Sequence, residues 1–363
     1  MQPTGDGVLQ VEPTDHCNLS CRMCAPHHEG WETVHGVPKG HLDPDLWARV
    51  IDSLVADDVR FDHIIFQWLG DPSLHPQLGR LIGDAARGLA GRVGYLRVDT
   101  NLIRMTPDRI DDLIAQLDGV DGGPPLLVVV TIDAHTAPTY AHVKGQDALD
   151  RVRRHVRHLV RVRRDCRTTI NLQLQFVVQD GNAHEAAAFR AYWTDLLACQ
   201  GSSDRFHDEL CFKRLSVGGG GAGQAAADRL YEQTIADAGI QPGPHRGVSI
   251  LTWEDRPWQE DDGNQGSRTA CPGLWLTPVI RQDGHLLMCC ADLHGSLDLG
   301  SLSDRTFRDL WDGPTATARR LEHLAGRFHH ACAACGGINW YETTPAMAAS
   351  ARARAAALGL EVG

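Results

Sequence analysis

The chain of 363 residues is 42% hydrophobic, which is enough for one large or two medium domains around a sizeable core. Its formal net charge of −11 argues against a partner held through nucleic-acid phosphates and mildly favours neutral or cationic substrates. The eleven cysteines come with no signal segment and no apolar run that could cross a bilayer, which predicts a cytoplasmic protein with metal ligands and free thiols, and no disulfide framework.

Strands and helices alternate along the first two thirds of the chain. Short apolar or alternating runs predict six strands, at residues 8–11, 63–68, 95–99, 126–132, 169–178 and 212–217. The runs between them predict helices at residues 42–56, 76–89, 107–117, 149–164 and 184–199. This order predicts an α/β fold, either a parallel barrel or an open sheet, whose active face lies at the carboxyl ends of the strands.

A loop with three cysteines follows the first strand directly, and we refer to it as the cysteine loop. Cys17, Cys21 and Cys24 are separated by three and then by two residues. Thiolates are the ligands of iron–sulfur clusters, and three of them leave one iron of a 4Fe-4S cube open to an outside molecule. A zinc knuckle with His16 or His27 as the fourth ligand is the alternative.

A second group of cysteines begins at residue 271. Cys271 is followed by an alternating strand, an Asp-Gly hairpin turn and a second strand that ends at Cys289. A helix at residues 304–311 and the pair Cys332 and Cys335 complete this region. The hairpin brings Cys271 beside Cys289, so four thiolates can meet at one place and hold either a 4Fe-4S cluster or a zinc ion.

The C-x3-C-x2-C spacing after a short strand resembles that of the radical S-adenosylmethionine (SAM) superfamily. The resemblance implies a partial barrel of six βα units over residues 8 to about 245. It also implies that the open iron chelates SAM, whose reductive cleavage gives a 5′-deoxyadenosyl radical that abstracts hydrogen from the substrate. A reductant of flavodoxin or ferredoxin type would supply the electron.

The strand ends carry polar segments that resemble cosubstrate-binding segments of this superfamily. Gly70, Asp71 and Pro72 lie in a loop that looks like the Gly-Gly-Glu loop, which in the family holds the amino group of SAM. Leu69 and Asp71 are departures from that pattern. The resemblance extends to the next three strands and implies cosubstrate contacts by Thr100, Asn101, Asp133, Gln173 and Gln175.

The C-terminal spacing, C-x12-G-x4-C followed by C-x2-C, resembles the twitch domain, a truncated form of the SPASM domain. This resemblance implies one auxiliary 4Fe-4S cluster bound by Cys271, Cys289, Cys332 and Cys335. Twitch regions of this kind are similar to those of aminocyclitol dehydrogenases. The predicted organisation is a barrel, a linker, a small β-hairpin/α auxiliary domain and a C-terminal helix, over residues 1–245, 246–270, 271–340 and 341–363.

Cys290 directly follows one of these predicted ligands. In sulfatase-maturing relatives this place holds an aspartate that acts as a base. A thiol there can instead return a hydrogen atom to the opposite face of the substrate radical, which inverts the carbon. Alternatively, Cys290 is packed away at the strand end and Asp292 is the base of a dehydrogenation. The remaining cysteines are expected to be packing residues, namely Cys166, Cys199 and Cys211.

The preferred interpretation is a radical SAM epimerase that acts on a carbinol carbon of a sugar or aminocyclitol in antibiotic biosynthesis. The alternatives are a radical SAM dehydrogenase, a peptide-modifying enzyme, and a non-catalytic iron–sulfur or zinc protein. The sixteen residues before Cys17 are too few for a peptide-leader domain, which favours a small-molecule substrate. The candidate substrate contacts at the barrel mouth are His27, His28, Trp31, Asp133, His135, Asp292 and His294.

Overall fold

The computed structural model describes residues 6–24, 37–200, 205–216, 221–252, 270–333, 335, 337 and 343–360. The strands form one eleven-stranded sheet in the order β11-β10-β9-β1-β2-β3-β4-β5-β6-β8-β7. Its central strands all pair in parallel. They are β1 (Val8–Val11), β2 (Phe61–Phe66), β3 (Val93–Thr100), β4 (Leu126–Thr131), β5 (Ile170–Val178), β6 (Glu209–Arg214) and β8 (Val248–Thr252).

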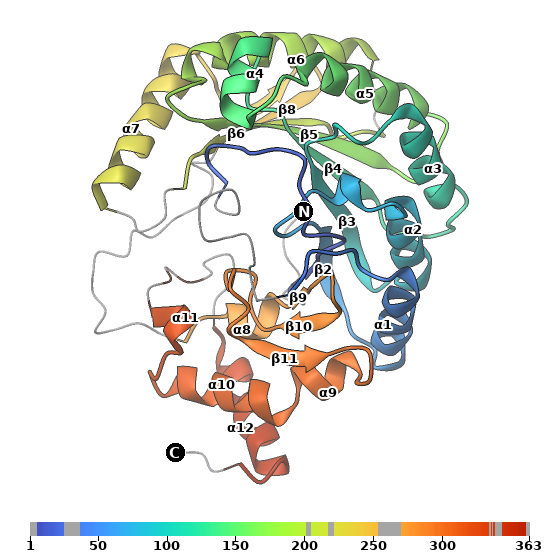
Figure 1. Ribbon diagram of the computed structural model, residues 1–363, viewed down its shortest axis with the longest axis vertical. Coiled ribbons are helices and arrows are strands. Elements are labelled where there is room, and N and C mark those ends of the chain that lie inside the picture. The colour runs from blue at the N-terminus through green and yellow to red at the C-terminus, as the bar shows by residue number, and fades with distance from the viewer. Residues whose placement is uncertain are drawn as a thin grey trace.

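Helices connect these strands and cover one face of the curved sheet (Figure 1). They are α1 (Pro44–Ala56), α2 (Leu78–Gly88), α3 (Pro107–Leu117), α4 (Ala137–Lys144), α5 (Leu149–Val162), α6 (Ala186–Gln200) and α7 (Gly221–Asp237). The first helix begins at Pro44, two residues after the predicted start, because the Asp43 side chain caps it by accepting a hydrogen bond from the backbone N–H of Asp45, and Pro44 occupies the first turn. The alternating βα order therefore gives the predicted α/β partial barrel.

The two faces of the sheet differ in polarity because successive side chains on a strand point to opposite sides. Leu96 and Val98 of β3 belong to the outer face and are buried in the core beneath the helices. The residues between and after them are polar, and the strand register places Asp99, Gln173 and Glu209 in one row across β3 to β6. The inner face of the barrel is therefore the polar one.

One predicted boundary is wrong. Residues 246–270 are predicted to form a linker. In the structure, β8 (Val248–Thr252) lies within this stretch, pairs in parallel with β6 and extends the barrel by one strand. The short strand β7 (Gly243–His245) then pairs antiparallel with β8 at the sheet edge. The five residues of β8 alternate buried and half-buried, a pattern that is too short to stand out without its partner strand.

The auxiliary region continues the same sheet at its other edge. β9 (Val279–Ile280) pairs in parallel with β1, and the predicted hairpin follows as β10 (His285–Leu287), with β11 (Asp298–Ser301) beside it. Gly284 at the hairpin turn has φ +80°, a conformation that favours glycine. The helices of this region are α8 (Gly273–Leu276), α9 (Phe307–Trp311), α10 (Pro314–Leu324), α11 (His330–Ala333) and α12 (Pro345–Ala357).

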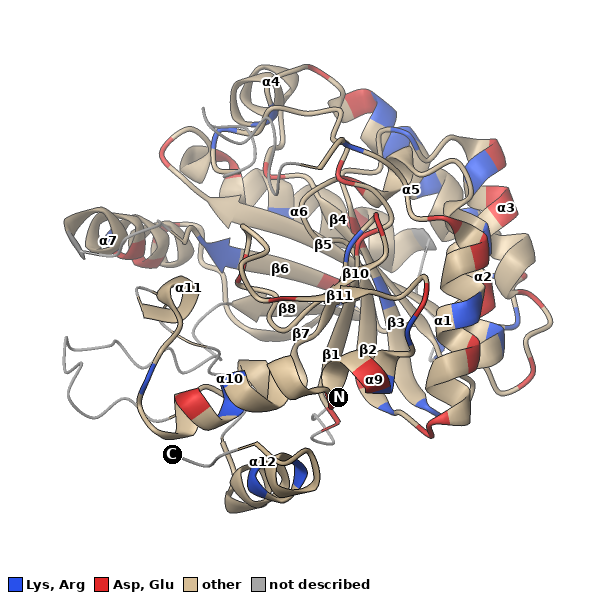
Figure 2. Ribbon diagram, turned by 60° about the horizontal axis from the view of Figure 1, so that its bottom comes forward, with Lys and Arg blue, Asp and Glu red and all other residues tan. Residues whose placement is uncertain are grey.

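The outer helices α1, α2 and α3 carry both positive and negative side chains, whereas α5 is mainly basic (Figure 2). Some of these charges pair within a helix, as Asp84 does with Arg80 and Arg87 on α2. Exposed pairs of this kind contribute little to stability because water screens them. Among the helices in the described ranges, none is both long and apolar enough to cross a membrane.

Arg163 and Asp208 form a fully buried ion pair that fixes the start of β6. The guanidinium donates to the carboxylate at 2.7 and 2.5 Å, and the backbone N–H of Leu172 donates to the same carboxylate at 3.0 Å. Removing the charge of one partner leaves the other buried without compensation. We expect Asp208→Asn to lower the free energy of unfolding by about 3 kcal/mol, measured by urea denaturation.

The exposed pair of Asp195 and Arg246 provides the matched control. Asp195→Asn removes the same kind of charge at the surface and should change the free energy of unfolding by less than about 1 kcal/mol. Equal losses in the two variants would contradict the structural role of the buried pair.

Candidate active site

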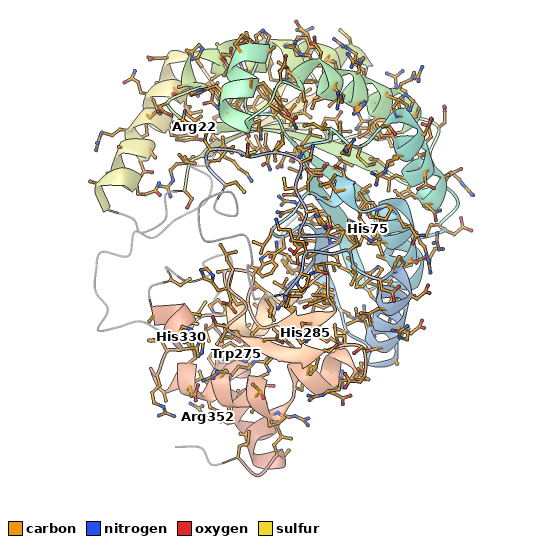
Figure 3. All side chains as sticks on the ribbon, viewed as in Figure 1. Arg22, His75, Trp275, His285, His330 and Arg352 are labelled. Atoms are coloured by element: carbon orange, nitrogen blue, oxygen red, sulfur yellow. The ribbon has the colours of Figure 1, made fainter. Side chains whose placement is uncertain are left out.

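The cysteine loop is held between the end of β3 and the end of α4. The backbone N–H groups of Ser20 and Arg22 donate to the carbonyls of Lys144 and Val143, at 3.3 and 3.1 Å. Gly145, at φ +85°, ends α4 and lies so close that a Cβ there would be 2.2 Å from the Ser20 hydroxyl. Figure 3 labels Arg22 on the side of the molecule where α4 lies. The loop therefore sits at the carboxyl edge of the sheet, as predicted.

The three thiols of this loop are half-buried and act on one another electrostatically. Burial raises the pKa of Cys17 to about 12 and that of Cys24 to about 11, and burial also raises the pKa of Cys21. Such thiols keep their protons at neutral pH until a metal displaces them. Three neighbouring, partly shielded thiols fit the three protein ligands of a SAM-binding cluster.

The zinc-knuckle alternative has less support in this geometry. Across the ranges that the structure describes, no three His, Cys, Asp or Glu side chains converge as ligands of a single metal ion. The ring of His16 packs beside the ring of His41, with 5.1 Å between centroids, and His27 lies outside the described residues. Of the two candidate fourth ligands of the zinc knuckle, the described residues therefore include only His16, whose ring packs against that of His41.

Gly70 lies where the loop after β2 touches the cysteine loop. A Cβ on Gly70 would be 2.3 Å from the carbonyl oxygen of Thr14 and 2.6 Å from that of His16. The backbone N–H of Asp71 donates to the same His16 carbonyl at 2.8 Å. Glycine is therefore required at residue 70 by this close backbone approach.

The Asp71 carboxylate, in the loop that resembles the family's SAM-binding loop, joins two strand ends. It accepts hydrogen bonds from the Thr100 hydroxyl at 2.9 Å, from the Asn101 N–H at 2.6 Å, and from both the N–H and the hydroxyl of Ser73. It also caps the short 3-10 turn that begins at Pro72. With four donors and 5% exposure, this carboxylate positions the loops and is not turned toward a ligand.

Asp133 is also placed differently from the prediction, which gave it a contact with the cosubstrate and substrate. Its side chain is fully buried, forms an ion pair with Lys144, and accepts from the Val177 N–H at 2.7 Å. A direct ligand contact would require this ion pair to break. The predicted mouth contact His135 packs edge-on against Tyr192, with 5.7 Å between ring centroids, and His294 is exposed. His27, His28 and Trp31 lie outside the described residues.

Gln173 and Gln175 share the polar inner face of the barrel. The amide of Gln175 donates to Gln173 at 2.7 Å, and the amide of Gln173 donates to Glu209 at 2.6 Å. On the same face, Arg97 and Asp99 form a two-pronged ion pair at 2.5 and 2.6 Å. Sequence reasoning missed Arg97, Asp99 and Glu209, although charged residues alternating with apolar ones on a predicted parallel strand are the signal for a polar inner face.

The four cysteines of the auxiliary region lie around one pocket. Cys271, Cys289, Cys332 and Cys335 all line one pocket, together with Asp292 and apolar side chains that include Leu274 and Leu297. The Thr277 hydroxyl lies 3.7 Å from the Cys289 sulfur, and the carboxylate of Asp292 accepts from the Leu297 N–H at 2.6 Å. Four thiols around one mostly apolar pocket fit a fully ligated iron–sulfur cluster.

Cys290 follows Cys289 at this strand end and is not among the residues that line the pocket. It packs against the small cluster of Trp68, Val279 and Leu287, and its backbone carbonyl accepts from the Trp68 indole N–H at 3.0 Å. The thiols of Cys289 and Cys290 share a hydrogen bond, which raises the pKa of Cys289 and lowers that of Cys290. Cys166 and Cys211 are buried as expected, but Cys199 is exposed and is no packing residue.

Glu12 connects the barrel to the auxiliary hairpin. Its carboxylate, 2% exposed, accepts from the backbone N–H of Leu69 at 3.2 Å and from that of Gln282 at 3.3 Å. Burial raises the pKa of Glu12 to about 7, although these two hydrogen bonds oppose the shift. One buried carboxyl group thus links the end of β1, the loop after β2 and the turn between β9 and β10.

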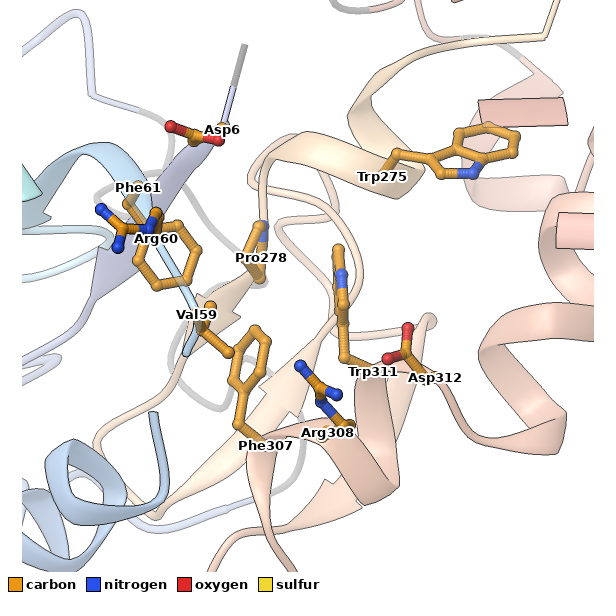
Figure 4. Close-up of a pocket in the computed structure, with 10 residues that line it drawn as sticks. All are labelled: Asp6, Val59, Arg60, Phe61, Trp275, Pro278, Phe307, Arg308, Trp311 and Asp312. Atoms are coloured by element: carbon orange, nitrogen blue, oxygen red, sulfur yellow. The ribbon is translucent and has the colours of Figure 1, made fainter. Parts of the chain in front are cut away.

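A second pocket lies at the amino ends of the strands, away from the cysteine loop (Figure 4). It is lined by Asp6, which precedes β1, by Phe61 at the start of β2, and by aromatic residues of the auxiliary region that include Trp275, Phe307 and Trp311. The amino ends of the strands face this pocket. Active sites of βα barrels lie at the carboxyl ends, so the chemistry is assigned to the cysteine edge.

Two family models match the chain, one for each cysteine region. Residues 11–174 match the radical SAM superfamily, and residues 271–336 match SPASM, an iron-sulfur cluster-binding domain. The tungsten-containing aldehyde ferredoxin oxidoreductase cofactor-modifying protein of Pyrococcus furiosus (strain ATCC 43587 / DSM 3638 / JCM 8422 / Vc1) is 28% identical over 158 residues. That alignment covers 41% of this chain and 38% of the relative, so it spans well under half of either protein.

Solved structures are similar in fold. Native anSMEcpe with bound AdoMet has a TM-score of 0.51 and 13% sequence identity, over 97% of this chain and 97% of that one. BtrN in complex with AdoMet and 2-DOIA has a TM-score of 0.44 and 16% identity, over 88% of this chain and 87% of that one.

A radical SAM domain implies a 4Fe-4S cluster and SAM, and a SPASM domain implies further iron–sulfur ligation. The two matched stretches contain the cysteine loop and the four cysteines of the auxiliary pocket. The chain therefore contains a radical SAM domain, followed by a SPASM-type iron–sulfur cluster-binding domain.

Proposed function

We propose that this protein is an epimerase that inverts a carbinol carbon of a sugar or aminocyclitol in antibiotic biosynthesis, with Cys290 as the hydrogen-atom donor. The observation that carries the proposal is the position of Cys290, between the auxiliary cysteines and the loop after β2. When bound at the cysteine loop, the 4Fe-4S cluster and SAM supply a 5′-deoxyadenosyl radical that abstracts the hydrogen atom from this carbon.

The surroundings of Cys290 support this role. Leu69 opens the loop that resembles the family's SAM-binding loop, and both Leu69 and Cys290 pack against the cluster of Trp68, Val279 and Leu287. The indole hydrogen bond of Trp68 to the Cys290 carbonyl fixes the backbone there. A thiol fixed at this seam reaches the side of the substrate that faces the auxiliary region, whereas the first hydrogen leaves toward the cosubstrate.

The hydrogen and electron balance requires a reductant. The C–H bond broken on one face is replaced by a C–H bond formed on the opposite face with the hydrogen of the Cys290 thiol. Cys290 is left as a thiyl radical, which one electron and one proton return to the thiol. A low-potential reductant of flavodoxin or ferredoxin type supplies this electron and the electron that SAM cleavage consumes.

The inner face of the barrel suits a hydroxylated, amino-bearing substrate. Gln173, Gln175 and Glu209 form a hydrogen-bonded row of amide and carboxylate groups. Arg97 and Asp99 neutralise each other in their ion pair. The carboxylate of Glu209 is then the remaining charge of this row, and it favours a substrate with an ammonium group. Sugars and aminocyclitols present several hydroxyl and amino groups that such a row can bind.

A dehydrogenase is the second candidate, and the position of Asp292 favours it. Asp292 lines the auxiliary pocket beside the cysteines and is 4% exposed. In this reaction a carboxylate at that place takes the proton of the substrate radical and the auxiliary cluster takes its electron, which gives a ketone. The two candidates differ in product mass, because inversion conserves the hydrogen count and dehydrogenation lowers it by two.

We expect Cys290→Ala to abolish inversion while 5′-deoxyadenosine formation continues, because the substrate radical forms but receives no hydrogen. The test is anaerobic turnover of the reconstituted enzyme on candidate aminoglycosides in deuterium oxide, followed by product mass spectrometry and NMR. The wild type should introduce one deuterium at the inverted carbon, since the Cys290 thiol exchanges with solvent.

Cys199→Ala is the matched control because this thiol is exposed and lies outside both cysteine groups. It should leave inversion and deuterium incorporation unchanged. A product two mass units lighter than the substrate, formed equally well by Cys290→Ala, would refute the epimerase and establish the dehydrogenase.

We also expect the two cysteine groups to hold separate clusters. Replacing Cys17, Cys21 and Cys24 together by Ala should remove about half of the iron and sulfide of the anaerobically reconstituted protein. The corresponding change at Cys332 and Cys335 should remove the other half. Stoichiometric zinc with no labile sulfide in the wild type would contradict the cluster assignment.

A further inference from the structure

A buried cation lies directly behind the cysteine loop. Lys144 is the last residue of α4 and is 2% exposed, and its ammonium pairs with the carboxylate of Asp133, which is fully buried. A buried lysine keeps its charge only beside such a partner. Lys144 is not among the residues predicted to contact SAM or substrate, so its position needs another explanation.

The backbone places this charge against the cysteines. The Lys144 carbonyl accepts from the backbone N–H of Ser20, and the Val143 carbonyl accepts from that of Arg22. The residues on both sides of Cys21 are therefore hydrogen-bonded to the end of α4. Burial raises the pKa of the Cys21 thiol, and the positive charge of Lys144 opposes this rise. The same charge opposes the rise that burial causes in the pKa of Cys24, three residues further along the loop. The ammonium group of Lys144 therefore acts on two of the three sulfurs, and at Cys21 the paired Asp133 carboxylate acts in the opposite direction.

Tyr140 provides an independent observation at the same place. It lies one helical turn before Lys144, on the same face of α4. Its side chain is fully buried, and within the described ranges its hydroxyl has no hydrogen-bond partner. A buried hydroxyl without a partner costs free energy, so an acceptor that the protein alone does not supply is expected beside it. The charges of Cys21 and Lys144 both act on this phenol.

Asp133 shows that the arrangement is maintained at a conformational cost. Its φ is +58°, in the left-handed region that is unfavourable for residues other than glycine, asparagine and aspartate. The Val177 N–H donates to its carboxylate at 2.7 Å, and the Asn182 side chain donates to its carbonyl at 2.8 Å. Strain that several contacts enforce is found mainly at functional sites.

We propose that Lys144 and Tyr140 are positioning residues that raise the reduction potential of the cluster held by Cys17, Cys21 and Cys24. The reduced cluster carries one more negative charge than the oxidised one, and a nearby ammonium group and hydroxyl donor stabilise that charge. The step concerned is the transfer of one electron from the reductant to the cluster, with no bond made or broken. The inference rests on this ligand assignment and is independent of the epimerase proposal.

The test is a potentiometric titration of the reconstituted enzyme without SAM and without substrate, followed by EPR of the reduced cluster. The ligands Cys332 and Cys335 are replaced by Ala in every sample, so that only the first cluster is observed. Lys144→Met should lower the ratio of reduced to oxidised cluster at a fixed potential about tenfold, a shift of about 59 mV for a one-electron couple. Tyr140→Phe should lower the ratio by a smaller factor, because it removes a donor and no charge.

Two further variants separate an electrostatic role from a structural one. Lys144→Arg keeps the charge and should restore most of the ratio. Lys39→Met removes the same charge at an exposed site and should leave the ratio unchanged, since water screens it. Iron and sulfide content is measured for each sample. If Lys144→Met fails to bind a cluster, the ratio of reduced to oxidised cluster in Tyr140→Phe tests the proposal. Unchanged ratios in variants with full iron content, or an equal loss in Lys39→Met, would overturn the proposal.

Discussion

The candidate site depends on how closely three backbone segments approach one another at the carboxyl edge of the sheet. A Cβ at Gly70 would overlap the carbonyl of Thr14, and a Cβ at Gly145 would overlap the hydroxyl of Ser20. Gly70 brings the loop after β2, and Gly145 the end of α4, into close contact with the cysteine loop. The sulfur positions are therefore set by main-chain packing, and side chains around them can change function without displacing the ligands.

Most acidic residues around the site hold loops in place and do not face the barrel interior. Asp71 joins the ends of β2 and β3, Asp133 pairs with Lys144, and Glu12 ties the barrel to the hairpin. Each of these carboxylates is at most 5% exposed, and backbone N–H groups donate to all three. Loops organised by buried carboxylates are in place before a ligand arrives, which lowers the ordering cost of binding.

The sequence was informative where chemistry restricts the residue type and less so where tertiary contacts decide the role. Cysteine spacing predicted both thiol groups, and alternation of strands and helices predicted the parallel sheet. The role of Asp71 could not be predicted, because its donors Thr100 and Asn101 come from the next strand. Lys144 gave no signal, since a single lysine at a helix end is ordinarily solvated. β8 was missed because a five-residue strand is recognised mainly by its pairing with β6.

The pairing of β9 with β1 makes the auxiliary region part of the barrel sheet and not an appended module. The backbone N–H groups of Gln10 and Glu12 donate across this seam to Pro278 and Ile280. Cutting the chain before Cys271 would leave β1 as an open edge strand, with Leu9 and Val11 nearby and no charged side chain on the strand to guard it. Exchanging auxiliary regions between such enzymes therefore replaces strands of the barrel sheet itself. A barrel truncated before Cys271 is a candidate for aggregation through its open edge strand.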